Sequence, residues 1–303
     1  MAKTAFIFPG QGAQYSGMGK ALAVSSPAAA AVFDKGEQLR PGIRELCFHG
    51  TEEELRQTRN AQPCLFLTEL AAARALEEAG FQAAAAAGFS LGELSAVCAA
   101  GLLPLERALP LVLLRGELME KAAAAQPAFM AAVLRLENER VEELAAGFRA
   151  VYPVNYNCPG QLTVSGAKEE EDDFLRAVRE AGGRAVPLKV SGGFHSPFMR
   201  SAAEAFSSLL SEESFAALQY PIYSNLTGRR YDSSPQELLS AQICSPVRWE
   251  SIIRQMLASG IDTFVELGPG STLSGMVQRI DRTVRTLHVE DAESLRSTVS
   301  ALR

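Results

Sequence analysis

Residues 88–92 read Gly-Phe-Ser-Leu-Gly. In this Gly-x-Ser-x-Gly pattern the glycines allow a sharp turn from a strand into a helix and leave the central serine exposed at the apex. The free N–H groups at the start of the following helix point toward that serine, where they can stabilise an oxyanion. The pattern therefore predicts a strand–turn–helix unit and makes Ser90 a candidate nucleophile for acyl transfer.

Short apolar runs alternate with helical patterns along most of the chain. Runs typical of buried strands occur at residues 5–8, in the Ala-rich stretch before Ser90, and at residues 222–224 and 263–266. Helical patterns cover residues 17–40, a short stretch opened by a capping box at Thr51, and residues 62–79, 91–100, 104–125 and 197–213. This alternation predicts the α/β class, with a large hydrolase-like domain built on a mostly parallel sheet.

Residues 127–191 follow a different order of elements. Strand patterns occur at residues 129–136, 152–157, 161–165 and 184–190, with helical patterns at residues 139–148 and 168–181. The resulting order β-α-β-β-α-β is that of ferredoxin-like domains. We therefore expect a small ferredoxin-like domain over residues 127–191, inserted into a large α/β catalytic domain formed by residues 1–126 and 192–303.

The composition limits the classes of function. Of the 303 residues, 47% are hydrophobic and 21% are charged, as is usual for a soluble globular protein. The net charge is −6, and no run of Lys or Arg occurs. This acidic balance argues against a nucleic-acid partner.

The chain has few of the residues that build disulfides or metal centres. Its five cysteines are scattered and form no C-x-x-C pair, and only three histidines are present. We therefore expect no disulfide framework and no metal site. The first apolar run is too short for a signal peptide, and no uncharged apolar stretch reaches membrane-spanning length. A cytoplasmic location without membrane contact is expected, and a monomer is the default oligomeric state.

Residues 9–14 read Pro-Gly-Gln-Gly-Ala-Gln and follow the first expected strand. They are not a dinucleotide fingerprint, which needs glycine where Tyr15 stands, and they lack the Gly-Lys-Ser/Thr of a P-loop. Two interpretations remain open. The segment is a tight turn, or it brings a backbone N–H, most simply that of Gln11, close to Ser90 as a second oxyanion donor.

A series of motifs along the whole chain resembles one known family. In chain order they are Phe-Pro-Gly-Gln-Gly-Ala-Gln (8–14), Gly-Phe-Ser-Leu-Gly-Glu (88–93), Leu-Leu-Arg-Gly (113–116), Asn-x-Asn-x-Pro-Gly-Gln (155–161), Phe-His-Ser (194–196), Ser-Asn-Leu-Thr-Gly (224–228), Gln242 followed by Ser-Pro-Val-Arg-Trp (245–249), and Glu-Leu-Gly-Pro-Gly (266–270). Together they resemble the malonyl-CoA:acyl carrier protein transacylase family. One departure is Phe89, where that family usually carries His. The position flanks the nucleophile and is not the base. We therefore expect changed packing, which can alter the acyl preference, and retained chemistry.

The resemblance implies a role for each matching residue. Ser90 would attack the thioester of malonyl-CoA, and His195 would act as its general base and later as the general acid. A backbone carbonyl near Gln242 would orient His195 in place of a carboxylate. This weaker orienting group suffices because the leaving thiolate needs less proton assistance than an amine. The backbone amides of Leu91 and Gln11 would bind the oxyanion.

Arg115 indicates the charge of the substrate. The positions three and four residues away on both sides are apolar, so its guanidinium emerges from an apolar stripe of the expected helix. Burial of a guanidinium calls for an anionic partner. From the local pattern that partner can be an internal Asp or Glu; the resemblance implies the free carboxylate of the malonyl group, held bidentately. Phe194 resembles the pattern associated with malonyl rather than methylmalonyl units.

The resemblance also implies the partners. The malonyl group would pass from malonyl-CoA to Ser90 and then to the phosphopantetheine thiol of an acyl carrier protein, for fatty-acid or polyketide synthesis. The protein would need no bound cofactor of its own, because the phosphopantetheine belongs to the acceptor.

Three rival functions are open at this stage. An α/β-hydrolase would use the chain order Ser…Asp…His, which Ser90, Asp262 and His288 satisfy. However, His288 lies in an apolar run that predicts a strand, and this plan leaves Arg115 without a role. A hydrolytic relative of the transacylases would differ only in using water as the acceptor. A non-catalytic module that binds a carrier protein is disfavoured by the joint presence of Ser90, His195 and Arg115.

Overall fold

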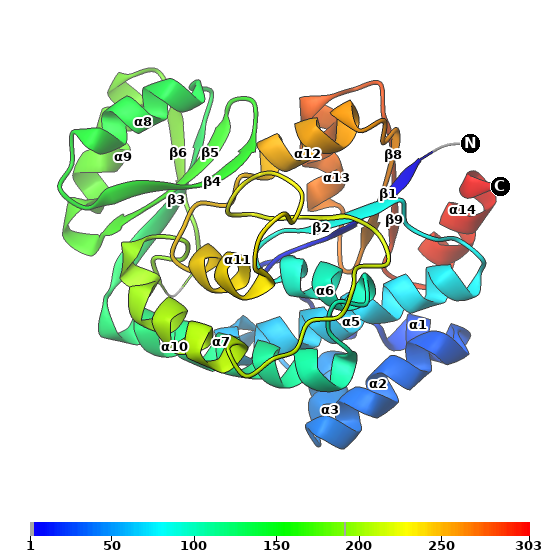
Figure 1. Cartoon of the computed structure of the whole chain (residues 1–303). Coiled ribbons are helices and arrows are strands. Elements are labelled where there is room, and N and C mark those ends of the chain that lie inside the picture. The colour runs from blue at the N-terminus through cyan, green and yellow to red at the C-terminus, as the bar shows by residue number, and fades with distance from the viewer. Residues whose placement is uncertain (1–2, 191) are drawn as a thin grey trace.

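The computed structural model describes residues 3–190 and 192–303, which form two β-sheets and the helices packed around them (Figure 1). The larger sheet has the strand order β7-β2-β1-β8-β9, and every neighbouring pair is parallel. Its strands are β1 (Thr4–Phe8), β2 (Ala85–Gly88), β7 (Ile222–Tyr223), β8 (Thr263–Leu267) and β9 (Arg285–Val289). The predicted α/β class with a mostly parallel sheet is confirmed.

Most of the remaining chain is helical. The α-helices of the described residues are α1 (Lys20–Ser25), α2 (Pro27–Leu39), α3 (Ile43–His49), α4 (Glu52–Arg56), α5 (Thr58–Glu78), α6 (Gly92–Ala99), α7 (Leu105–Ala125), α8 (Asn138–Ala146), α9 (Glu171–Glu180), α10 (Arg200–Leu210), α11 (Pro235–Gln242), α12 (Trp249–Ala258), α13 (Thr272–Ile280) and α14 (Ala292–Leu302). Two short 3-10 turns, η1 (Lys168–Glu170) and η2 (Pro197–Met199), precede α9 and α10.

Helix boundaries follow local capping signals and burial. The capping box expected at Thr51 is present at the start of α4. The single helix expected over residues 17–40 is divided into α1 and α2, because Ser26 caps α2 and Pro27 occupies its first position. The next long helix, α5, begins one turn earlier than expected, at the buried Thr58.

The parallel sheet is covered on both faces. In β1, Phe6 and Phe8 belong to a hydrophobic core that they share with α5, α6 and α7. Ala5 and Ile7 belong to a second core, which they share with α12 and α13. Because strand side chains alternate in direction, one strand of five residues supplies both cores, and for that reason residues 5–8 are continuously apolar.

The smaller sheet is antiparallel, with the order β4-β5-β3-β6. Its strands are β3 (Ala128–Leu134), β4 (Val151–Cys158), β5 (Gln161–Ala167) and β6 (Arg184–Pro187). With α8 and α9 it has its own hydrophobic core and the β-α-β-β-α-β order of a ferredoxin-like unit; it forms the green part of Figure 1, at the end of the molecule away from both termini. The domain boundaries at 126/127 and 191/192 stay a prediction, and Ser191 lies outside the described residues.

Backbone pairing joins the small sheet to the rest of the molecule. The Tyr156 N–H donates to the Val247 carbonyl at 2.9 Å, and the Val247 N–H donates to the Val154 carbonyl at 2.8 Å. Arg279 of α13 adds hydrogen bonds to Gln161 Oε1 at 2.6 Å and to the Pro159 carbonyl at 3.1 Å. The edge strand β4 is therefore held close to the carboxyl edge of the parallel sheet.

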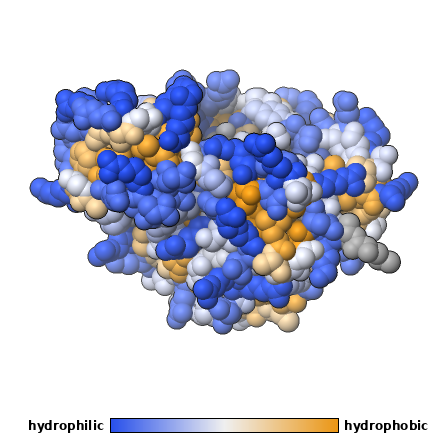
Figure 2. Space-filling model, turned by 90° about the horizontal axis from the view of Figure 1, so that it is seen from above, coloured by the Kyte–Doolittle hydropathy of each residue, from blue (hydrophilic) through white to orange (hydrophobic). Residues whose placement is uncertain are grey.

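No helix in the described ranges is long and apolar enough to cross a membrane. The face seen from above is mainly hydrophilic, and hydrophobic residues gather there in a few separate patches (Figure 2). Small separate apolar patches of this kind are normal for a protein surface.

The turn between β2 and α6 crosses the end of β1 at very short range. A Cβ added at Gly92 would lie 2.2 Å from the Phe8 carbonyl oxygen, and one added at Gly88 would lie 1.8 Å from the backbone of Gly92. Both glycines of the Gly-x-Ser-x-Gly motif are therefore required because no side chain fits, which is a stronger constraint than conformational freedom.

We expect Gly92→Ala to destabilise the protein by about 3 kcal/mol or more, because the new methyl group would have to displace backbone. Gly275→Ala is the matched control. Gly275 lies in α13, and outside its own turn of helix no atom lies within 4 Å of an added Cβ, so its substitution should be neutral or stabilising by up to about 1 kcal/mol. Urea unfolding of the three proteins tests this, and equal midpoints for Gly92→Ala and the parent would contradict the close crossing.

Candidate active site

Ser90 lies at the carboxyl edge of the parallel sheet, between β2 and α6. Its φ is 54°, in the left-handed region that is uncommon outside glycine. Asn225 supports this conformation: its Oδ1 accepts a hydrogen bond from the Ser90 N–H at 2.7 Å, and its Nδ2 donates to the Gly88 carbonyl at 2.6 Å. The turn is therefore the strained elbow expected for a nucleophile.

His195 reaches Ser90 from the segment after β6. Its Nε2 lies 2.7 Å from Ser90 Oγ, and its Nδ1 lies 2.9 Å from the Gln242 carbonyl oxygen. Because a carbonyl can only accept, Nδ1 carries the proton and Nε2 is free to accept one from Ser90. The approach is tight, since a Cβ added at Gly193 would lie 2.5 Å from the Phe198 ring.

The surroundings keep His195 uncharged. Its side chain is buried, and burial together with the nearby Arg115 cation lowers the pKa of His195 to about 4, although the hydrogen bond to the Gln242 carbonyl acts in the opposite direction. At neutral pH the imidazole is therefore a neutral base, the state in which it can take a proton from Ser90.

Arg115 projects from α7 toward the same point and is 1% exposed. Its Nη1 donates to Gln62 Oε1 at 2.8 Å, and its Nη2 donates to Gln242 Oε1 at 2.8 Å and to Ser90 Oγ at 3.3 Å. Burial lowers the pKa of Arg115 to about 10, so it remains a cation at neutral pH. Within the described ranges no carboxylate oxygen lies within 4.0 Å of it. The internal ion pair that the sequence left open is therefore not found in contact.

The backbone N–H groups of Gln11 and Leu91 have no hydrogen-bond acceptor among the residues that the structure describes. Leu91 follows Ser90 directly, at the N-terminal end of α6. Gln11 lies in the segment after β1, which contacts the elbow, since a Cβ added at Gly10 would lie 2.7 Å from the Phe89 carbonyl oxygen. Both groups are thus available as oxyanion donors.

Two adjoining cavities lie at this edge of the parallel sheet. The smaller, of about 100 Å³, is lined by Ser90, His195, Phe194 and other side chains. The larger, of about 260 Å³, is lined by residues 9–13 and by side chains of β4, β5 and α13. Gln11, Phe89, Asn155 and Leu188 line both cavities, so the two adjoin, and we refer to them together as the path to Ser90.

The small sheet contributes two side-chain amides to this path. Asn155 and Asn157 of β4 line the larger cavity, and the Oδ1 of each is buried with no hydrogen-bond partner in the described chain. Asn157 is 4% exposed, so an unpaired polar atom there is unfavourable. The path is therefore suited to a ligand that carries amide groups.

Phe89 occupies the position where the resembling family usually has His. Its ring packs edge-on against the buried Trp249, with the ring centroids 5.7 Å apart. The side chain is thus an apolar wall of the path, and the contact between Ser90 and His195 is present beside it.

The structure brings together Ser90, His195, Arg115, Gln11, Leu91, Phe194 and Gln242, all proposed from the sequence. It adds three that sequence reasoning did not assign: Asn225, Glu93 and Gln62. Glu93 is the last residue of the motif at 88–93, and Asn225 is the second residue of the motif at 224–228. Both motifs were part of the resemblance, but it gave neither residue a role. Gln62 gave no signal, because one glutamine in a helical pattern is ordinary.

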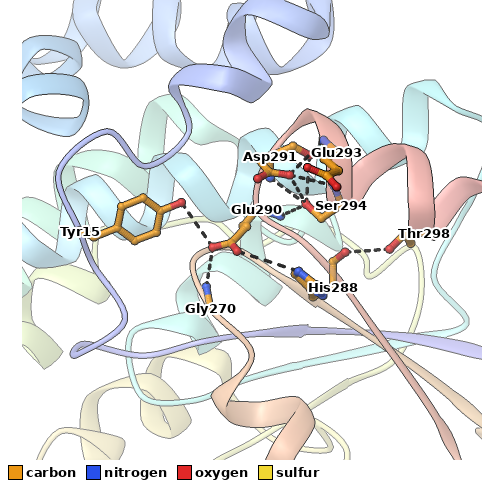
Figure 3. Close-up of polar contacts among 8 residues, drawn as sticks. All are labelled: Tyr15, Gly270, His288, Glu290, Asp291, Glu293, Ser294 and Thr298. Atoms are coloured by element: carbon orange, nitrogen blue, oxygen red, sulfur yellow. Dashed lines mark hydrogen bonds and ion pairs between the residues drawn. The ribbon is translucent and has the colours of Figure 1, made fainter.

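The alternative Ser…Asp…His set is not assembled. Asp262 precedes β8 at the amino edge of the parallel sheet, whereas Ser90 follows β2 at the carboxyl edge. His288 lies in β9, three strands from β2, which places the two strands roughly 14 Å apart. Its Nε2 is 4.0 Å from Glu290 Oε1, and its carbonyl accepts from Thr298, in a separate polar cluster (Figure 3).

The described part of the chain holds no group of three or more His, Cys, Asp or Glu side chains that could bind a metal ion. Its five cysteines are all free thiols, and four of them are buried.

Comparisons with known proteins agree with this geometry. The acyl transferase domain family matches residues 5–298. A malonyl CoA-acyl carrier protein transacylase of Bacillus subtilis is 38% identical over 311 residues, covering 100% of this chain and 98% of the relative. One from Staphylococcus aureus is 34% identical, with 98% of each protein covered.

Solved structures show the same fold. The malonyl CoA-acyl carrier protein transacylase of Clostridium perfringens superposes with a TM-score of 0.96 at 38% identity, covering 100% of this chain and 98% of that one. A type II polyketide synthase malonyl-transacylase, solved in complex with its acyl-carrier protein, superposes with a TM-score of 0.93 at 33% identity, covering 99% and 100%. The chain therefore belongs to the malonyl CoA-acyl carrier protein transacylase family of acyltransferases.

Proposed function

We propose that the protein transfers a malonyl group from malonyl-CoA to the phosphopantetheine thiol of an acyl carrier protein through a malonyl-Ser90 ester. The observation that carries this proposal is the position of Arg115. A buried guanidinium with only neutral partners lies 3.3 Å from the Oγ of a serine that is also in contact with a neutral histidine. An acyl group that ends in a carboxylate supplies the missing anion.

In the first half-reaction, Ser90 Oγ attacks the thioester carbonyl of malonyl-CoA while its proton passes to His195 Nε2. The Gln11 and Leu91 amides donate to the developing oxyanion. The tetrahedral intermediate then collapses with cleavage of the C–S bond, and His195 returns the proton to the leaving CoA thiolate. In the second half-reaction the carrier-protein thiol gives its proton to His195 and attacks the ester carbonyl. The C–O bond to Ser90 then breaks, and His195 returns the proton to the leaving Ser90 Oγ.

The proposal also assigns roles to the other residues of the site, to the larger cavity and to the two domains. Gln242 orients His195 through its carbonyl, and Phe194 narrows the acyl cavity in favour of malonyl over methylmalonyl units. The larger cavity takes the amide-bearing pantetheine arm of donor and acceptor in turn. The acceptor serves fatty-acid or polyketide synthesis; no cofactor is bound by the chain itself, which acts as a monomer. Residues 1–126 and 192–303 form the catalytic domain, and residues 127–191 the inserted one.

Malonyl-CoA alone should add one malonyl group to the protein, because the first half-reaction needs no acceptor. The Ser90→Ala variant should stay unmodified. Intact-mass spectrometry before and after addition of a holo acyl carrier protein checks both steps, since the carrier protein should gain the group that the enzyme loses. An adduct on one of the cysteines would contradict the role of Ser90, and release of free malonate instead of transfer would favour a hydrolase.

His195→Ala should slow acylation of Ser90 by roughly 10²- to 10⁴-fold, the range for a lost general base. The matched variant His288→Ala removes an imidazole from the separate polar cluster and should leave the rate unchanged. Single-turnover acylation of both variants, normalised to folded protein by circular dichroism, makes the comparison. A larger loss for His288→Ala than for His195→Ala would reverse the assignment.

Arg115→Ala should reduce transfer from malonyl-CoA by about 100-fold or more, because it removes one half of a desolvated ion pair worth on the order of 3 kcal/mol. Transfer from acetyl-CoA, which has no carboxylate, should be unchanged or improved. The ratio of kcat/KM values for the two donors is the measurement, with thermal unfolding as the control for folding. Equal losses for both donors, with lowered stability, would mean a structural role.

A further inference from the structure

Glu93 is a buried carboxyl that the transfer mechanism does not use. It lies in the first turn of α6, three residues after Ser90, and is 0% exposed. Three groups donate to it: Gln242 Nε2 at 2.6 Å, the Tyr231 hydroxyl at 2.7 Å and the Asn225 N–H at 3.2 Å. A fully desolvated carboxyl is unfavourable unless such donors surround it, so its presence beside the nucleophile calls for a reason.

Two of these donors belong to residues whose side chains hold the catalytic elbow: the backbone N–H of Asn225 and the side-chain amide of Gln242. Asn225 bonds both the Ser90 N–H and the Gly88 carbonyl. Gln242 donates from Nε2 to the Ser90 carbonyl at 2.8 Å, accepts from Arg115 at Oε1, and orients His195 through its backbone carbonyl. The Glu93 carboxyl therefore contacts two residues, Asn225 and Gln242. These two residues in turn contact the nucleophile, the base and the cation.

Three contacts fix the direction of the Gln242 amide: those with Arg115, the Ser90 carbonyl and Glu93. Arg115 can only donate, so Gln242 must present its Oε1 to the guanidinium and its NH₂ group to the opposite side. An ionised carboxylate only accepts, so Glu93 selects that same direction for the amide. If the Gln242 amide were turned over, its NH₂ group would face the N–H groups of Arg115, and neither could accept a hydrogen bond.

We propose, on the basis of the transfer reaction above, that Glu93 is a positioning residue: its carboxylate sets Gln242 and Asn225, and through them the geometry of Ser90, His195 and Arg115. The carboxylate also acts as the distant counter-charge of Arg115, bridged by the Gln242 amide, and leaves the guanidinium free to contact a substrate carboxylate.

The ionisation of Glu93 gives this role a measurable signature. Burial raises the pKa of Glu93 to about 7, although its three donors and the Arg115 cation act in the opposite direction. Of the ionisable groups around it, Arg115 keeps a pKa of about 10, the pKa of Tyr231 is raised well above its usual range, and the pKa of His195 is about 4. Glu69 of α5 contacts α6 through Ser95, two residues after Glu93.

The test is the rate of Ser90 acylation by malonyl-CoA and by acetyl-CoA between pH 5.5 and 8.5, in single turnovers without carrier protein. The parent rate should rise with pH through about pH 7, as Glu93 ionises. Glu93→Gln replaces one acceptor oxygen by a donor, so we expect both rates to fall by about 10- to 100-fold, the loss typical when a group that orients an active-site residue is removed. The rise near neutral pH should disappear.

Glu69→Gln is the matched control, because Glu69 is also a fully buried carboxyl but contacts Ser95 rather than the active site. It should keep both the parent rate and the rise. An equal loss for Glu69→Gln and Glu93→Gln would overturn the proposal, as would a parent-like rate and profile for Glu93→Gln.

If Glu93→Gln does not fold, Tyr231→Phe tests whether the ionisation of Glu93 sets the pH dependence of acylation. It removes one donor to the carboxylate, so the pKa of Glu93 should rise further and the pH-dependent rise should move to higher pH with the same plateau. An unmoved profile would overturn the proposal. A parent protein that forms no malonyl-Ser90 would contradict the proposed transfer itself, whereas a parent that acylates normally beside unaffected variants would contradict the role of Glu93 alone.

Discussion

The close crossing of two backbones at Gly92 is the constraint on which the rest of the site depends. The Phe8 carbonyl lies where a side chain of residue 92 would stand, so the elbow that carries Ser90 is pressed against the end of β1. The segment after β1 consequently passes beside the elbow, since a Cβ added at Gly10 would lie 2.7 Å from the Phe89 carbonyl oxygen. The packing of a strand against a turn thus brings the backbone before Gln11 to the residues around Ser90, and the oxyanion role proposed for the Gln11 and Leu91 amides depends on this approach.

The burial of a single cation governs the electrostatics around Ser90. Arg115 is surrounded by neutral amides, and its charge helps to lower the pKa of His195, which keeps that base free of a proton. Its charge is balanced at a distance by Glu93 through Gln242. A fixed cation beside the nucleophile favours an acyl group with a terminal carboxylate, because such a group replaces the solvation that the guanidinium has lost.

Most of the fold could be predicted from the sequence, because its strands and helices carry local patterns of apolar residues. Residues 5–8 are apolar throughout because both faces of a parallel sheet are covered, and the order of strand and helix patterns after residue 127 gave the ferredoxin-like unit. The split between α1 and α2 was missed, although Ser26-Pro27 carries the signal. The early start of α5 had no local signal, because the burial of Thr58 depends on residues distant in the chain.

The sequence by itself determined the family, the nucleophile elbow and the residues at which to look for a base and a cation, because these are local patterns of residue type and spacing. Only the tertiary structure decided that no described carboxylate contacts Arg115, that the carbonyl facing His195 Nδ1 is that of Gln242 itself, and that Asn225 and Glu93 contact the elbow. The contacts among these residues join positions up to 152 apart, and spacing along the chain carries no information on contacts made through folding.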